Sequence, residues 1–112
     1  MLSTIKPAPI ARDRRINLPG LTSNNTVAYV DDSGAQCVRL HNTLVAKRAP
    51  DGAITLDSGG FRTVTTKRRI NEALRAWRSD WVVYQRKGEW LAKERYPGGV
   101  CPLEFIDGMV LS

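Results

Sequence analysis

Residues 26–56 contain three runs rich in residues that favour β-strands, TVAYV, QCVRLHNTLVAKR and AITL. Two turn-forming sequences, DDSG and PDG, separate these runs. The middle run alternates in hydrophobicity, with Val38 and Leu40 on one face and Arg39 on the other, until HNT divides it into two strands. The pattern predicts an antiparallel meander.

A different periodicity begins at Thr66. Four apolar residues recur at i, i+3, i+4 and i+7, which is one stripe of an amphipathic helix: Ile70, Ala73, Leu74 and Trp77. Polar residues cover the other side of this helix: Lys67, Arg68, Asn71, Glu72, Arg75 and Arg78. We expect Thr65 or Thr66 to cap the helix, because a hydroxyl there accepts a hydrogen bond from an N–H of the first turn.

The run WVVYQRKGEWLAKE predicts two strands joined by a tight turn at Lys87–Gly88, where glycine takes the positive φ that such a turn needs. In this hairpin Arg86 faces Glu89, and Tyr84 faces Leu91. The last apolar run, CPLEFIDGMVL, can add one more strand. The order of elements is therefore β-β-β-α-β-β, with or without a terminal strand. We expect an α+β fold, a twisted antiparallel sheet with one amphipathic helix packed on one face.

The composition divides the chain into an arm and a domain. Residues 1–20 contain three prolines and several basic residues without helical or strand periodicity, so we expect a mobile basic arm. Residues 21–112 are expected to form a single α+β domain, since a chain of 112 residues is too short for two cores. The arm lacks the apolar segment of a signal peptide, and no stretch reaches the roughly 18 apolar residues of a membrane span. We therefore expect a soluble protein without a membrane partner.

The chain carries a formal net charge of +6, and arginine outnumbers lysine by 12 to 5. Because guanidinium groups match the geometry of phosphate and carboxylate groups, this excess favours an anionic partner. The two cysteines, Cys37 and Cys101, form neither a C-x-x-C pair nor a disulfide framework. This cysteine usage favours a reducing cytoplasm.

Gly59 and Gly60, followed by Thr65, Thr66 and Lys67, suggest a phosphate site, because free N–H groups and a helix N-terminus attract anions. The candidate anion site consists of Gly60, Thr65 and Thr66. The order of residues differs from that of a P-loop, in which lysine precedes serine or threonine. The alternative, which we favour, is a glycine turn followed by a threonine cap.

A second candidate site is the basic outer face of the helix. Arg68 and Arg75 are seven residues apart and nearly superposed in projection, and only Glu72 interrupts the stripe. Together with flanking residues and the arm, this face can neutralise several phosphates, as expected of a nucleic-acid-binding protein. The residues of this candidate surface are Arg12, Arg14, Arg15, Arg62, Lys67, Arg68, Arg75 and Arg78. The alternative is an ordinary solvated helix face.

The remaining side chains offer weaker candidates. Four aromatic residues can stack nucleic-acid bases, but core packing is more common in small proteins: Phe61, Trp81, Tyr84 and Trp90. On one strand, Cys37 and His41 would lie roughly 13 Å apart, too far for a nucleophile and its base. Adding Cys101 gives at most three soft ligands at a spacing that zinc sites do not use. We therefore predict no enzyme activity, no metal site and no cofactor.

The segments VRLHNTLVA, ITLDSGGFRTVTTKRRIN, VVYQRKGEWLA and FIDGMVL together resemble a group of small uncharacterised proteins encoded by bacteriophages. In that group an L-H-x-T stretch precedes an S-G-G-[FW]-x-T-x-T-T-K-x-R-x-N core and a late D-G-M. The match covers roughly residues 37–110, and Phe61 occupies the aromatic position. The resemblance implies a phage gene product that acts in the cytoplasm of an infected bacterium, and it implies no particular activity.

Three functions are consistent with these features. We expect a non-enzymatic binding protein whose basic helix face and N-terminal arm contact nucleic acid through phosphates, without reading the sequence. The alternative is a protein-directed inhibitor of a host or antiphage defence complex, of the nuclease or CRISPR type, in which the same basic face meets an acidic protein surface. The third hypothesis is a minor virion or assembly component.

Overall fold

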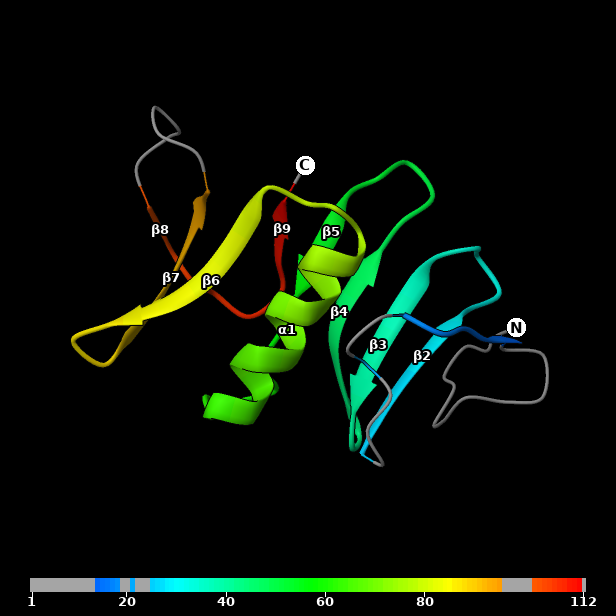
Figure 1. The fold of residues 1–112 in the computed structure, drawn as a ribbon, viewed down its shortest axis with the longest axis horizontal. Helices are drawn as coiled ribbons and strands as arrows, with labels where there is room; N and C mark the ends of the chain where they lie inside the picture. The colour runs from blue at the N-terminus through cyan, green and yellow to red at the C-terminus, as the bar shows by residue number, and fades with distance from the viewer. Residues whose placement is uncertain (1–13, 19–20, 22–24, 96–101, 112) are drawn as a thin grey trace, which may run out of the picture.

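The computed structural model describes residues 14–18, 21, 25–95 and 102–111. Within these residues the chain forms one α-helix and two antiparallel sheets (Figure 1), which confirms the predicted α+β class. No helix of the described part is long and apolar enough to cross a membrane.

The larger sheet contains six strands in the order β1-β2-β3-β4-β5-β9. Its strands are β1 (Arg14–Arg15), β2 (Thr26–Val30), β3 (Gln36–Leu40), β4 (Thr43–Arg48), β5 (Ile54–Leu56) and β9 (Met109–Leu111). Strands β2 to β5 are the predicted meander, and the HNT sequence does divide its middle run into two strands. The terminal strand is also confirmed, because β9 pairs with β5 through the register Leu56↔Met109.

The smaller sheet contains β6 (Trp81–Arg86), β7 (Glu89–Glu94) and β8 (Leu103–Glu104). Its hairpin has the predicted register, with Arg86 opposite Glu89 and Tyr84 opposite Leu91. The structure differs from the expectation of one continuous sheet, because β9 occupies the position beside β5. The β6–β7 hairpin therefore cannot extend the larger sheet there, and it pairs with β8 instead.

Helix α1 spans Val64–Ala76 and begins two residues before the predicted start. Thr63 is the N-cap, so the assignment of the cap to Thr65 or Thr66 was wrong. The backbone of Thr63 is extended, with φ −107° and ψ 164°, and its Oγ1 accepts a hydrogen bond from the Thr66 N–H at 3.1 Å. A cap residue needs this non-helical backbone, whereas Thr65 and Thr66 lie in the first turn.

The C-terminal end of α1 is closed by a Schellman motif. The Ser79 N–H donates to the Leu74 carbonyl, and the Arg78 N–H donates to the Arg75 carbonyl. Arg78 adopts a left-handed conformation, with φ 57°, at the position where glycine is most common. Its positive charge suits the negative end of the helix dipole. The motif reverses the chain so that β6 runs back along the helix.

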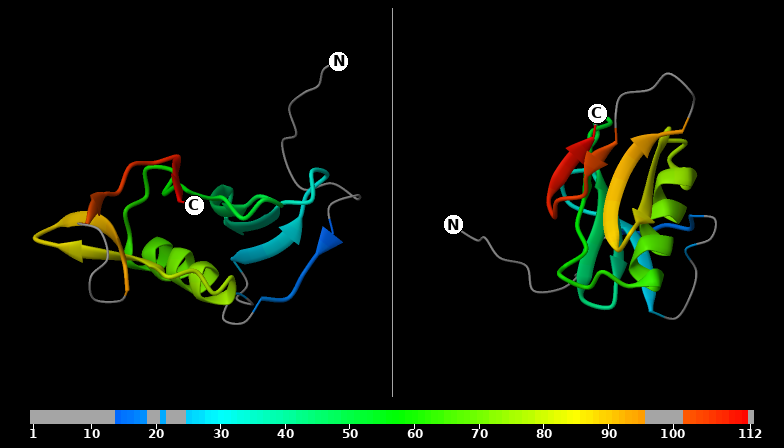
Figure 2. Two further views of the ribbon diagram at one scale, coloured as in Figure 1. Left: turned by 90° about the horizontal axis from the view of Figure 1, so that it is seen from above. Right: turned by 90° about the vertical axis from the view of Figure 1, so that its left-hand side faces the viewer.

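The core lies between the helix and the two sheets. Helix α1 contacts β3 and β4 on one side and β6 on the other, and Figure 2 shows it on one face of the larger sheet. Ile70, Ala73 and Leu74 of the predicted stripe are buried, and Trp77 is half-buried. Asn71, predicted on the polar face, instead binds β6: its amide accepts from the Val83 N–H and donates to the Val83 carbonyl, both at 2.8 Å.

The aromatic residues divide between the core and the surface. Trp90 is buried and meets Phe105 edge-on, with ring centroids 5.3 Å apart. Trp81 packs against the core and Tyr84 is half-buried. Phe61 differs from these residues, because it is 63% exposed. Core packing is therefore confirmed for Trp90 and Trp81, and it is wrong for Phe61.

Candidate functional site

Two exposed arginines, Arg68 and Arg75, lie on α1, and a third, Arg78, lies two residues after its C-terminal end. Among the residues that the structure describes, none of their guanidinium groups has a hydrogen-bond or ion-pair partner. Glu72, which interrupts the stripe in the sequence, pairs with Arg69 instead, at 2.8 Å. The acidic group of this helix is therefore already neutralised by a different arginine.

Arg62 and Lys67 were predicted for the same surface, but their side chains contact other parts of the fold. The Arg62 Nε donates to Ser58 Oγ at 3.2 Å, and its Nη2 lies 3.9 Å from Asp107 Oδ1. Its guanidinium also lies over the rings of Trp90 and Phe105, 5.3 and 4.9 Å from their centroids. Lys67 donates to Gln85 of β6 at 3.2 Å. The charges of both residues are therefore engaged within the fold.

The arginines of the predicted arm are only partly described. Arg12 lies outside the described residues. Arg14 and Arg15 form β1, the edge strand of the larger sheet, which pairs with Val30 and Tyr29 of β2. The side chain of Arg15 is exposed, and the next residue continues the attachment to β2 by a backbone hydrogen bond to Ala28. The arm is thus joined to the sheet from Arg14 onward.

Two of the three N–H groups of the candidate anion site, those of Gly60 and Thr66, have acceptors within the fold. The Gly60 N–H donates to Ser58 Oγ at 3.2 Å, and the Thr66 N–H donates to Thr63 Oγ1. The Thr66 hydroxyl is buried and lies 3.0 Å from that of Thr63. Thr65 alone of the three residues presents an exposed side chain without such a contact in the described part of the chain. The glycine turn and threonine cap account for the rest of the motif.

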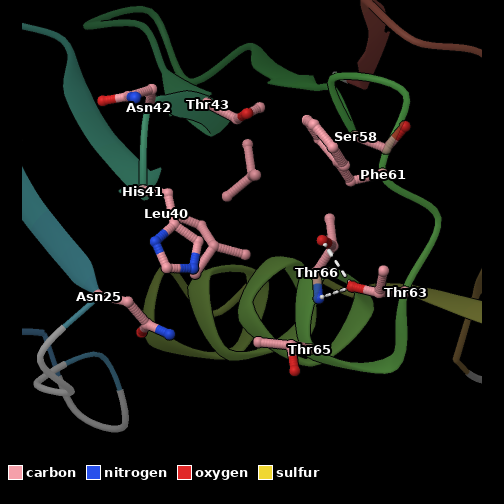
Figure 3. Close-up of a pocket in the computed structure, with 11 residues that line it drawn as sticks. Asn25, Leu40, His41, Asn42, Thr43, Ser58, Phe61, Thr63, Thr65 and Thr66 are labelled. Atoms are coloured by element: carbon pink, nitrogen blue, oxygen red, sulfur yellow. Dashed lines mark hydrogen bonds between the residues drawn. The ribbon is translucent and has the colours of Figure 1, made fainter.

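A pocket of about 510 Å³ lies between the β3–β4 turn and the N-terminal end of α1 (Figure 3). Its walls come from the β3–β4 turn region, from the loop before α1 and from the first turn of the helix. The residues that line it are Asn25, Leu40, His41, Asn42, Thr43, Val45, Ser58, Phe61, Thr63, Thr65 and Thr66. The L-H-x-T segment and the S-G-G-F-x-T-x-T-T segment therefore meet at one cavity.

Close contact between the two segments sets the shape of this pocket. Gly59 has φ 63°, and a Cβ at this position would lie 2.6 Å from Thr43 Cγ2. Only glycine allows the loop to approach the start of β4 so closely. The adjacent Ser58 is fully buried, and both its N–H and its hydroxyl donate to Asp107 Oδ1, at 2.8 and 2.7 Å. The loop is thus held from both sides.

The carboxylate that holds this loop is stabilised in its charged form. Burial raises the pKa of Asp107, but the two hydrogen bonds from Ser58 and the nearby Arg62 charge outweigh burial and lower the pKa below its usual 3.8. Asp107 therefore remains an acceptor for Ser58 at neutral pH.

Most of the pocket surface is apolar, and none of its lining residues is Asp, Glu, Lys or Arg. His41 sits in the tight turn between β3 and β4 with φ 54°, a conformation that is uncommon for residues other than glycine. Figure 3 shows the rings of His41 and Phe61 on opposite sides of the cavity. The two residues are twenty positions apart in the sequence. Such a lining suits a neutral, planar ligand better than an anion.

The cysteine and histidine considered as a catalytic pair lie in different environments. His41 lies in the turn after β3 rather than on the strand, and it is exposed. Cys37 is buried in β3, where burial and the nearby Asp31 charge raise its pKa to about 11. Cys101 lies outside the described residues. Within the described ranges, no group of three or more His, Cys, Asp or Glu side chains could hold a metal ion.

Comparison with known proteins identifies the family. The family model described as Kyanoviridae Gp96 protein matches residues 10–112, nearly the whole chain. The chain belongs to this family. It is therefore a bacteriophage-encoded protein, as its resemblance to phage proteins implied, and the match also includes the basic residues from Arg12 onward. No curated protein and no solved structure matches the chain.

The pocket was not predicted from the sequence, although several of its residues were noted individually. His41 was considered as a catalytic or metal-binding residue and Phe61 as one of four aromatic residues, and both also belong to the motif shared with the phage proteins. A signal was present in the L-H-x-T and S-G-G-F-x-T-x-T-T segments, since both contain polar residues next to a predicted turn. The sequence does not show the close approach of Thr43 and Gly59, which brings the two turns together in the structure.

Proposed function

We propose that this phage protein is a non-enzymatic nucleic-acid-binding protein that contacts phosphates through Arg68, Arg75 and Arg78. The observation that carries the proposal is the excess of unpaired positive charge on α1 and at its C-terminal end. Three exposed guanidinium groups have no acidic partner among the described residues, while Glu72 is engaged by Arg69. Exposed, clustered arginines of this kind favour a polyanionic partner.

The spacing of the arginines supports a repeating anion. Arg68 and Arg75 are separated by two helical turns, about 10.5 Å along the axis at 1.5 Å per residue. Phosphates recur regularly along each strand of a nucleic acid, so a polyanion can present a separate phosphate to each of the two arginines. A single acidic side chain on a protein partner would not match both positions.

The proposal includes the arm and excludes sequence readout. Arg15 is exposed on β1, and Arg12 and Arg14 extend the basic character of the same segment. Contacts to phosphates position a protein on nucleic acid without distinguishing bases. We expect the protein to bind unrelated sequences with similar affinity in the cytoplasm of the infected bacterium.

The test is the salt dependence of binding to a labelled DNA duplex, measured by fluorescence anisotropy. Replacing Arg68, Arg75 or Arg78 with alanine should each reduce the magnitude of the log K against log salt slope by about 0.9, and the triple variant by about 2.7. The matched control is Arg86→Ala, which removes an exposed arginine from the end of β6. This control should leave the slope unchanged.

The absence of binding to DNA and RNA at about 50 mM salt, where phosphate contacts are strong, would refute the proposal. A saturable one-to-one complex with an acidic host protein, weakened by the same arginine substitutions, would then support the defence-inhibitor hypothesis. If Arg86→Ala reduced the log K against log salt slope by the same amount, the net charge of the protein, rather than the position of these arginines, would determine binding.

A further inference from the structure

We infer that the pocket between the β3–β4 turn and the N-terminal end of α1 accepts an unstacked nucleobase. The inference rests on the proposed function for the origin of the base, and it adds a second contact that phosphate binding does not supply. A protein that holds the backbone on α1 and a base in this pocket would prefer single-stranded over duplex nucleic acid.

The exposed aromatic ring of Phe61 is the first reason. Its side chain is 63% exposed at the pocket wall, so most of the ring is accessible to a ligand. Figure 3 shows the imidazole of His41 on the opposite side of the same cavity. Phenyl and imidazole rings are among the groups on which proteins stack unpaired bases.

The chemistry of the lining is the second reason. The cavity of about 510 Å³ falls within the size range of small-molecule pockets. Asn42, Thr43 and Thr65 offer amide and hydroxyl groups at its wall, which can pair with the donors and acceptors on a base edge. A phosphate would find no lysine or arginine side chain in this lining, whereas a base is neutral and has both an apolar face and a polar edge.

The position of the pocket relative to the basic face is the third reason. Thr65 lines the pocket, and Arg68 follows it by three residues on the exposed side of α1. Residues at this spacing are neighbours on a helix surface, with about 5–6 Å between their Cβ atoms. A nucleotide whose phosphate contacts Arg68 therefore has its base within reach of the pocket.

The experiment compares a short oligothymidylate with an abasic strand of the same length and with a duplex, all labelled for anisotropy. The oligothymidylate should bind more tightly than the abasic strand, because both carry the same phosphates but only one carries bases. Phe61→Ala should weaken oligothymidylate binding by roughly 5- to 150-fold, the range for loss of one aromatic stacking contact. It should leave abasic-strand and duplex binding unchanged.

Two variants control for the fold and for exposed apolar area. Val64→Ala shortens a neighbouring side chain that is 65% exposed and does not line the pocket, so binding should not change. Phe61→Trp retains an aromatic face and should retain the preference for bases. Circular dichroism should show the same melting temperature for the Phe61 variants and the native protein, since the side chain is largely exposed.

The source of the base is tested by titrating thymidine into the protein and following amide chemical shifts. Shifts confined to the pocket, without a preference for oligothymidylate over the abasic strand, would support a site for free nucleosides. Equal affinity for oligothymidylate, abasic strand and duplex, with no thymidine shifts, would overturn this inference and leave the proposed function intact. If the protein bound none of the strands, the proposed function would be refuted. If thymidine also caused no change in amide chemical shifts, the inference that the pocket accepts a base would be refuted as well.

Discussion

Replacing Gly59 with alanine tests the contact on which the pocket depends. At φ 63° an added Cβ would lie 2.6 Å from Thr43 Cγ2 and 2.9 Å from Thr43 Oγ1. Thr43 begins β4 and its short side chain is branched at Cβ, so it has little freedom to move away. The alanine must therefore displace either the strand or the loop that form the two pocket walls.

Three terms set the expected loss of stability. A left-handed backbone costs a residue with a Cβ about 1–2 kcal/mol. Lower entropy of the unfolded chain offsets about 0.4–1 kcal/mol of this loss. Steric overlap in a packed site adds about 1–3 kcal/mol. The free energy of unfolding of Gly59→Ala should therefore fall by about 3 kcal/mol, as measured by urea denaturation.

Gly60→Ala is the matched control, because Gly60 also has a positive φ, 85°, but an added Cβ would meet nothing within 4 Å. Only the two backbone terms apply, so the expected loss is about 1 kcal/mol. Thr43→Ala removes the two nearest atoms and leaves the Thr43 Cβ, 3.3 Å from the new Cβ. In the Gly59→Ala/Thr43→Ala double variant most of the steric term should disappear, and the two losses should not add. Equal losses at Gly59 and Gly60, together with an additive double variant, would refute the proposed contact.

Two further predictions concern the helix and the loop carboxylate. Leu74→Ala, at a fully buried position, should lower the free energy of unfolding by about 2–5 kcal/mol, whereas Arg75→Ala should change it by less than about 0.5 kcal/mol in the same urea assay. Because the pKa of Asp107 is lowered in the folded state, its contribution to stability is present above the unfolded pKa and is lost as pH falls through the folded pKa. The stability difference between native protein and Asp107→Asn should therefore be large at pH 7 and shrink as pH falls below about 4; a constant difference would contradict this explanation.

Local periodicity was sufficient to predict most of the secondary structure. The apolar stripe of α1 and the turn at Lys87–Gly88 depend on neighbouring residues, and both are found as expected. The N-cap was missed because three threonines lie close together, and only the backbone angles distinguish Thr63 from the others. The division into two sheets could not be predicted locally, because it depends on β9 pairing with β5 from more than fifty residues away.

The basic face was easier to predict than the pocket, for a physical reason. Arg68 and Arg75 lie on one helix, so their common orientation follows from helical geometry. Their lack of an acidic partner did not follow, because it depends on Glu72 pairing with Arg69. The pocket depends on two turns that meet through tertiary packing, which neither turn specifies alone.

The same loop shows which of its residues stabilise the fold and which remain available to a ligand. Ser58 is buried and donates to Asp107, Gly59 allows close approach to β4, and Thr63 caps α1, so each has a structural explanation. Phe61 has none of these roles: in the same loop its ring remains mostly in water, where apolar area is unfavourable. Truncation of Phe61 should therefore cost little stability, while truncation of its neighbours should cost much. A residue whose removal affects binding but not folding is what a ligand-binding position requires, and Phe61 is the position in this loop where the two effects can be separated.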